Sequence, residues 1–228
     1  MKNPKTLRRT RSRPDTVKRV KTGIHNVDRL LGGGIPEKET LLIKGEPGAG
    51  KTNLGLEFLY RGALNGENGL YISFQDTEDD VLRANTFDWN FEEHVEQGRI
   101  NIRKMDPYRY EQVPDMIRGM IKENNADRVV VDPITDLDLY IDSRKDIRKN
   151  LLSIKREITN LGATSLLLAE NEEATEIEDE VVDGIVNMEV VREQGQVKRE
   201  IYIKKLRGSD YNHSVHNYVF NSDGLKVQ

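Results

Sequence analysis

The sequence predicts an α/β fold in which a mostly parallel sheet is flanked by helices and extended by antiparallel β-hairpins. Three observations support this prediction. Short apolar runs typical of buried strands alternate with longer segments of helical spacing between residues 40 and 169. A glycine-rich, phosphate-binding pattern lies at the first junction between a strand and a helix. Two strand pairs, each with a glycine in its turn, follow in the last third of the chain.

Length and composition limit the class of protein. The 228 residues suit one large domain, or one domain with an appendage. Hydrophobic residues make up 36% and charged residues 32%, which is typical of a soluble globular protein with a sizeable core. No cysteine is present, which excludes disulfides and thiolate metal sites. No apolar run approaches the roughly 18 residues of a membrane span, and the basic N-terminus lacks the apolar stretch of a secretory signal. We therefore expect a cytoplasmic protein that is not in a membrane.

The first residues differ in charge from the rest of the chain. Residues 1–21 carry nine Lys or Arg and one acid, whereas the remainder carries 26 bases and 38 acids. This contrast predicts a basic, flexible tail over residues 1–21 and one folded domain over residues 22–228. Such a tail attracts nucleic acid or an acidic partner through charge, but it has no aromatic residue to stack on bases. Nucleic-acid binding through the tail therefore stays an alternative that we do not favour.

A short segment opens the domain before the first core strand. Asn26 or Asp28 is placed to cap a short helix over residues 27–31. Three glycines, residues 32–34, indicate a turn rather than a second phosphate loop, because no Lys-Thr pair follows them. We interpret His25 as a structural or surface residue, since only Asp28 lies at metal-ligand spacing.

The core alternates between the two kinds of element. Apolar runs predict buried strands, and apolar residues three and four apart predict the helices that cover them. The predicted strands are residues 40–44, 69–74, 99–104, 128–132 and 163–169. The predicted helices run from the phosphate loop to about residue 64, over 77–85, shortly after 87–91, and over 113–124 and 143–161. The predicted hairpins join 185–191 to 199–206, and 217–220 to 225–227, the second through a favourable Asp-Gly turn.

The glycine-rich stretch matches the pattern G-x-x-x-x-G-K-[ST]. Glycines let the backbone curl so that its N–H groups point at phosphate oxygens, and the following helix adds partial positive charge at its N-terminus. Lys51 is predicted to reach the β- and γ-phosphates, and the Thr52 hydroxyl to bind Mg²⁺. A surface turn that matches by accident is the alternative, but the strand and helix on either side favour nucleoside triphosphate binding. The predicted binding residues are Gly45, Glu46, Pro47, Gly48, Ala49, Gly50, Lys51, Thr52 and the next residue, Asn53.

A second metal ligand is predicted at Asp132. Three valines, residues 129–131, form an apolar strand that ends in this carboxylate. The carboxyl ends of parallel strands meet beside a phosphate loop, where an acid holds Mg²⁺ directly or through water. A turn that ends the strand, helped by Pro133, is the structural alternative.

Hydrolysis also needs a group that orients or deprotonates water, and such a group should follow another core strand. Gln75 and Asp76 directly follow the strand predicted over residues 69–74. Gln75 can orient water by hydrogen bonding but cannot accept its proton as a carboxylate does. Asp76 can accept it if its shorter side chain reaches the water. Either residue could instead cap the helix that follows.

Together, these motifs resemble the KaiC-like branch of the RecA-type ATPases, as a single-domain member, over nearly all of residues 22–227. No motif after the phosphate loop is specific alone, but their order and spacing are. The motifs are Thr-Gly-Ile at 22–24 with Gly-Gly-Gly-Ile-Pro at 32–36, the phosphate loop, Tyr-Ile-Ser-Phe-Gln-Asp-Thr at 71–77, Phe-Asp-Trp at 87–89, Val-Val-Val-Asp at 129–132, Leu-Gly-Ala-Thr at 161–164 and Lys-Leu-Arg-Gly-Ser at 205–209.

The resemblance implies a RecA-like P-loop NTPase fold that forms a homo-oligomeric ring, usually a hexamer, with ATP and Mg²⁺ between subunits. It implies that Lys205 and Arg207 reach the γ-phosphate of the ATP held by the neighbouring subunit, a role that suits an arginine finger. A basic strand end is the structural alternative for both. The resemblance also implies that Trp89 and its neighbours contribute to a pocket for the base.

The sequence departs from the family pattern at the catalytic pair. The family usually carries Glu-Glu after the second strand, where this chain has Gln75 and Asp76. We therefore expect intact ATP binding with slow, Mg²⁺-dependent hydrolysis, in a nucleotide-switched regulatory or signalling ring that acts on an unidentified protein partner. One alternative is a DNA-binding recombinase relative, which the acidic charge outside the tail disfavours. Another is an ATP-binding pseudo-enzyme without turnover.

Overall fold

The computed structural model describes residues 17–170, 176–193 and 195–228, so the tail predicted over residues 1–21 lies mostly outside the described residues. Its centre is one large sheet. The strands of this sheet are β3 (Thr40–Gly45), β4 (Gly69–Ser73), β5 (Ile100–Lys104), β6 (Arg128–Asp132), β7 (Thr164–Glu170), β8 (Gly184–Glu193), β9 (Gln196–Leu206), β10 (His216–Asn221) and β11 (Gly224–Val227).

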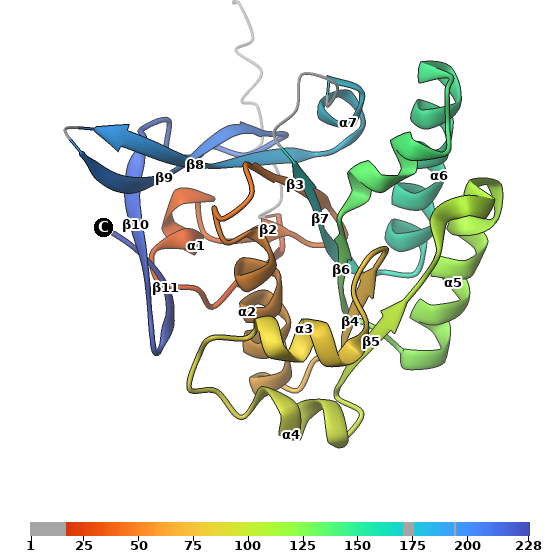
Figure 1. Ribbon diagram of the computed structural model, residues 1–228, viewed down its shortest axis with the longest axis horizontal. Coiled ribbons are helices and arrows are strands. Elements are labelled where there is room, and N and C mark those ends of the chain that lie inside the picture. The colour runs from red at the N-terminus through yellow and green to blue at the C-terminus, as the bar shows by residue number, and fades with distance from the viewer. Residues whose placement is uncertain (1–16, 171–175, 194) are drawn as a thin grey trace, which may run out of the picture.

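The sheet has nine strands in the order β11-β10-β9-β8-β3-β7-β6-β4-β5 (Figure 1). The strands from β8 to β5 in this order run parallel, and β9, β10 and β11 extend the sheet with antiparallel pairing. The prediction of a mostly parallel sheet with antiparallel C-terminal hairpins is therefore confirmed.

Helices cover both faces of the sheet, as the alternation of elements predicts. They are α1 (Val27–Leu30), α2 (Lys51–Leu64), α3 (Glu78–Ala84), α4 (Phe91–Glu96), α5 (Val113–Asn124), α6 (Arg144–Asn160) and α7 (Glu176–Val181). Helices α1 to α4 pack in one hydrophobic cluster, and α5 to α7 pack in a second. Successive strand residues point to opposite faces, so Leu41 and Ile43 of β3 join the first cluster and Leu42 joins the second. No helix in the described part of the chain is long and apolar enough to cross a membrane.

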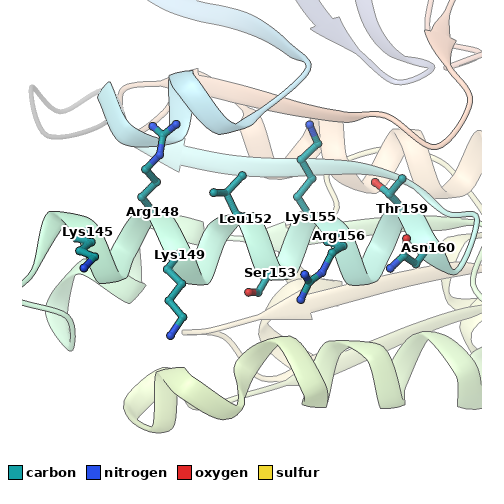
Figure 2. Close-up of a pocket in the computed structure, with 9 residues that line it drawn as sticks. All are labelled: Lys145, Arg148, Lys149, Leu152, Ser153, Lys155, Arg156, Thr159 and Asn160. Carbon is teal, nitrogen blue, oxygen red and sulfur yellow. The ribbon is translucent and has the colours of Figure 1, made fainter.

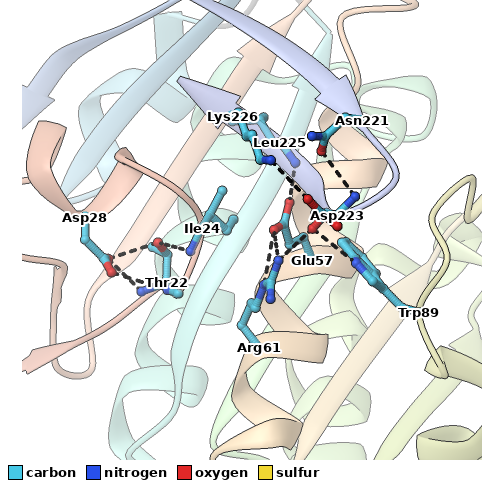
Figure 3. A network of polar contacts seen from close by, with 11 residues as sticks. Thr22, Ile24, Asp28, Glu57, Arg61, Trp89, Asn221, Asp223, Leu225 and Lys226 are labelled. Carbon is cyan, nitrogen blue, oxygen red and sulfur yellow. Dashed lines mark hydrogen bonds and ion pairs between the residues drawn. The ribbon is translucent and has the colours of Figure 1, made fainter. Parts of the chain in front are cut away.

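The segment before the first core strand is more ordered than predicted. Strand β1 (Arg19–Val20) pairs antiparallel with β2 (Ile35–Pro36), so two residues assigned to the flexible tail belong to the fold. The capping prediction is wrong for both candidates. Asn26 stands before α1 with a φ of 62° and makes no side-chain cap, and Asp28 instead accepts hydrogen bonds from the backbone and hydroxyl of Thr22 (Figure 3).

The C-terminal hairpin is fastened to α2 by a buried carboxylate. Glu57 accepts hydrogen bonds from the Leu225 backbone N–H at 2.8 Å and from Arg61 at 2.9 Å (Figure 3). Arg61 and the Trp89 indole both donate to the carbonyl of Asp223, in the turn between β10 and β11. This network holds the hairpin beside the helix that begins at the phosphate loop.

Arg128 is a second buried charge that joins distant parts of the chain. Its guanidinium donates to the carbonyls of Phe58 and Lys21, both at 2.8 Å, and pairs with Glu67. The side chain is only 2% exposed. The start of β6 is thereby linked to α2 and to the N-terminal segment.

We expect Arg128→Met to lower the free energy of unfolding by about 3 kcal/mol, because the buried carbonyl of Phe58 and the partly buried carbonyl of Lys21 lose their donor and Glu67 loses its partner. Equilibrium unfolding in urea measures this loss. The matched control is Arg83→Met, since Arg83 and its partner Asp80 have side chains that are 74% and 46% exposed. Exposed pairs contribute little, so the control should change stability by less than about 0.5 kcal/mol. Equal losses in the two variants would contradict the structural role of Arg128.

Candidate nucleotide-binding site

Four adjacent strands end at one edge of the sheet and bring most of the predicted site residues together. These strands are β3, β7, β6 and β4, which are neighbours and run parallel. The phosphate loop follows β3, and Asp132 is the last residue of β6. Gln75 and Asp76 lie just beyond the end of β4 at Ser73. The four strand ends therefore form one site.

A cavity of about 350 Å³ lies at this edge. Most of its lining was predicted from the sequence, and two residues were not. The lining residues that were predicted are Pro47, Gly48, Gly50, Lys51, Thr52, Asn53, Gln75, Asp76 and Asp132, and those that were missed are Pro133 and Glu170. Gly45, Glu46 and Ala49 belong to the loop but do not line the cavity.

Side chains from the C-terminal strands hold the phosphate loop in place. The Tyr218 hydroxyl donates to the carbonyl of Ala49 at 2.6 Å, and the Tyr218 side chain is buried. Gly50 has a φ of 92°, and a Cβ at this position would lie 2.3 Å from the Phe220 ring. Glycine is therefore required at Gly50 both for its backbone conformation and for its close approach to β10. On the other side, Glu46 accepts a hydrogen bond from the backbone of β8.

Lys51 is the first residue of α2, and its side chain extends back to the start of the phosphate loop. Its ammonium donates to the carbonyl of Gly45 at 2.7 Å. Burial lowers the pKa of Lys51, and the nearby carboxylates of Asp132, Glu170 and Glu46 oppose that shift. Among the described residues that line this cavity, Lys51 is the only cation, and it lies near these acids where the charge of a phosphate would be neutralised.

Thr52 and Asp132 form an oxygen-rich corner suited to Mg²⁺. The Thr52 hydroxyl donates to a carboxylate oxygen of Asp132 at 2.8 Å, and the Tyr71 hydroxyl donates to the same oxygen. Burial raises the pKa of Asp132, while the hydrogen bonds from Tyr71 and Thr52 lower it. Carboxylate and hydroxyl oxygens are ligands that Mg²⁺ prefers, with phosphates and water completing its shell. Consistent with so few protein ligands, no cluster of three or more His, Cys, Asp or Glu in the described residues is arranged to hold a metal alone.

Neither Gln75 nor Asp76 caps the helix that follows them. The Gln75 amide donates to Asp136 at 3.0 Å, and the backbone N–H of Asp76 donates to the Ser73 hydroxyl at 2.7 Å. The cap of α3 is Thr77, whose side chain accepts the backbone N–H of Asp80 in a complete capping box. The alternative in which Gln75 or Asp76 caps this helix is therefore wrong, and both side chains face the cavity.

Lys205 and Arg207 lie at the opposite edge of the sheet from the phosphate loop of their own chain. Because β9 runs antiparallel to β8, Leu206 pairs with Gly184 at the start of β8, and Gly184 pairs with Leu41 near the start of β3. The loop begins four residues further along β3, a strand length of about 13 Å. Lys205 donates to two carbonyls around α7, and Arg207 donates to a third.

Trp89 is also outside the cavity. Its ring stacks on Tyr60 with centroids 4.8 Å apart, and its indole N–H donates to Asp223 in the hairpin turn. Tyr60 is nine residues along α2 from Lys51, which is about 13 Å of helix. Trp89 therefore packs between α2 and the hairpin, and its contribution to a pocket for the base stays a prediction.

A larger groove of about 690 Å³ runs along α6, and its lining is basic (Figure 2). Arg148 and Lys155 extend away from α5, and they pair with Glu180 in α7 and with Asp183 just beyond it. Lys149 and Arg156 extend toward α5 (Figure 2). None of the described residues that line the groove is aromatic. Like the N-terminal tail, it offers charge without a surface on which bases could stack, and it lacks a glycine-rich loop.

The sheet order and the glycine-rich loop at the junction of β3 and α2 define an ATPase of the RecA superfamily. The family model described as the KaiC ATPase matches residues 20–228. The chain therefore belongs to the KaiC ATPase family.

Relatives and solved structures agree with this assignment over nearly the whole chain. A UPF0273 protein of Thermotoga maritima is 29% identical, with 92% of this chain and 96% of the relative covered. A UPF0273 protein of Pyrococcus horikoshii is 32% identical, with 92% and 94% covered. The crystal structure of a KaiC-like protein from Pyrococcus horikoshii superposes with a TM-score of 0.84 at 28% identity, covering 93% of this chain and 99% of that one.

Proposed function

We propose that this chain binds ATP with Mg²⁺ in the cavity at the β3 edge, hydrolyses it slowly, and uses the nucleotide to switch the assembly of a homo-oligomeric ring. The observation that carries the proposal is the placement of two half-sites on opposite edges of one sheet. The phosphate loop lies at one edge, and Lys205 and Arg207 lie at the other. Neither half-site is complete without a second subunit.

Each residue of the first half-site has a chemical role in this proposal. The N–H groups of the loop bind phosphate oxygens, and Lys51 leaves the Gly45 carbonyl to bind the β- and γ-phosphates. Thr52 and Asp132 would hold Mg²⁺, which neutralises the charge on the phosphates when it is bound. Gln75 orients water, but an amide cannot accept a proton, so the family's usual route to fast hydrolysis is missing.

The second half-site acts on the neighbouring subunit. A guanidinium that contacts the γ-phosphate in the transition state stabilises the charge that spreads over its oxygens. A contact from one edge to the opposite edge of the next subunit is heterologous and closes into a ring by rotation. We propose a hexamer, in which ATP at each interface sets the conformation that a protein partner recognises.

Light scattering with and without Mg-ATP, with phosphate release followed in the same samples, tests this function. We expect the mass to rise to that of a ring when ATP is added. We expect phosphate release at well below one per second, the low end of typical turnover numbers.

Gln75→Glu introduces the carboxylate that the family pattern has at this position. This variant should raise the turnover at least tenfold, because general-base catalysis contributes 10²–10⁴-fold. A chain that stays monomeric with Mg-ATP would overturn the ring, and bound ATP without release would identify a pseudo-enzyme.

A further inference from the structure

Hydrolysis at this site needs a proton acceptor that the predicted catalytic pair does not supply well. Gln75 is an amide, and its nitrogen already donates to Asp136. A search for the acceptor is therefore a search among the carboxylates around the cavity. Four of them come from the strand ends and the loops that follow: Asp76, Asp132, Asp136 and Glu170.

Glu170 lies on the other side of Asp132 from the end of β4, and it is further along its own strand than Asp132 is. Strand pairing places Ile72, Val131 and Leu167 in one row across β4, β6 and β7. Gln75 and Glu170 are each three residues beyond that row, whereas Asp132 is one residue beyond it. Glu170 therefore reaches about 7 Å further out than Asp132.

Of these four acids, Glu170 is the one on a strand directly beside β3 and its phosphate loop. It ends β7, the strand directly beside β3, and it pairs in register with Gly45, the first loop residue. It lines the cavity together with Lys51, and its charge opposes the burial that lowers the pKa of Lys51. Gln75 and Asp76, in contrast, follow β4, which is two strands further from the loop.

The other three carboxylates are less suited to take the proton. Asp132 already accepts hydrogen bonds from Thr52 and Tyr71, and it is the proposed metal ligand. Asp136 accepts the Gln75 amide and is not among the residues that line the cavity. Asp76 lines the cavity, but its side chain is one methylene shorter than that of Glu170.

We propose that Glu170 is the general base that accepts the proton of the attacking water during ATP hydrolysis. The water oxygen forms a bond to the γ-phosphorus as the bond from that phosphorus to the bridging oxygen breaks, and the bonding electrons leave with ADP. One proton of the water passes to the Glu170 carboxylate, and the products are ADP and inorganic phosphate. The proton then returns to solvent. This inference rests on the proposed function, because it concerns the same cavity.

The test compares Glu170→Gln with Asp76→Asn. Both changes keep the shape of the side chain and remove its ability to accept a proton. We expect Glu170→Gln to lower kcat about 100-fold, within the usual range for loss of a general base, while the dissociation constant of a fluorescent ATP analogue changes less than twofold. Nucleotide recovered from the Glu170→Gln protein after incubation should remain ATP, whereas the wild type should yield ADP. Asp76→Asn, which removes the competing carboxylate, should lower kcat much less than Glu170→Gln does, and the control Glu123→Gln, at an exposed acid of α5 that does not line the cavity, should leave kcat unchanged.

Three results would overturn the assignment. They are a Glu170→Gln variant with more than a third of the wild-type kcat, an Asp76→Asn variant that loses as much activity as Glu170→Gln, and a wild type that binds ATP without releasing phosphate. The last result would leave nucleotide binding intact. That result would also remove the hydrolysis from the proposed function. The first two results overturn only the role of Glu170, because the wild type still binds and hydrolyses ATP in both, and a wild type that does not bind the analogue would overturn the nucleotide site itself.

Discussion

Lys51→Ala is expected to weaken ATP binding about 50-fold and to lower kcat at least about 100-fold. Within the part of the chain that the structure describes, the ammonium is the only cation that lines the cavity. A charge-assisted hydrogen bond to phosphate contributes about 1.5–3 kcal/mol, and loss of a group that stabilises transition-state charge costs about 10²–10³ in rate. Titration with a fluorescent ATP analogue and a phosphate-release assay measure the two effects.

The matched control is Lys122→Ala, which removes an exposed lysine in the last turn of α5, a helix that does not contribute to the cavity. It should leave affinity and turnover unchanged. If Lys51→Ala bound ATP as the wild type does, the assignment of the cavity as the phosphate site would be wrong. Equal melting temperatures of the two variants would show that the effect is not a loss of folding.

Arg207→Ala is expected to lower kcat about 10³-fold with little change in ATP affinity, the size of effect that arginine fingers show. Arg207 donates at 3.2 Å to one carbonyl at an exposed site, so the fold should lose little stability. Arg192→Ala, which removes an exposed arginine on β8, is the control. Turnover measured at saturating Mg-ATP separates the rate effect from affinity.

Mixing the two inactive variants tests action between subunits. A ring that contains Lys51→Ala and Arg207→Ala subunits has some interfaces where an intact phosphate loop faces an intact Arg207. We therefore expect phosphate release to return on mixing to well above that of either variant alone. Release that stays at the level of the separate variants would show that Arg207 does not act in trans.

The elements that could be predicted are those with a local pattern. Three valines before Asp132, the glycine pattern before Lys51 and the Asp-Gly turn at residues 223–224 each specify a backbone conformation within a few residues. The structure confirms the strand, the loop-to-helix junction and the hairpin at these places. Glu170 could have been found by the same rule that selected Asp132 and Gln75. Glu170 is the polar residue at the carboxyl end of β7, but the strand predicted over residues 163–169 stops one residue before it.

The sequence by itself determined the strands, the helices, the phosphate loop and the family resemblance, because each depends on neighbouring residues or on motif order. Only the tertiary structure decided which distant groups meet. Tyr218 and Phe220 lie against the phosphate loop, although about 170 residues separate them from it in the sequence. Trp89 packs against the C-terminal hairpin and does not line the candidate cavity. The order of the strands places Glu170 beside the loop, and the reversal at β9 sends Arg207 to the opposite edge. Pairing between strands sets these positions, and no local sequence pattern records which strands will pair.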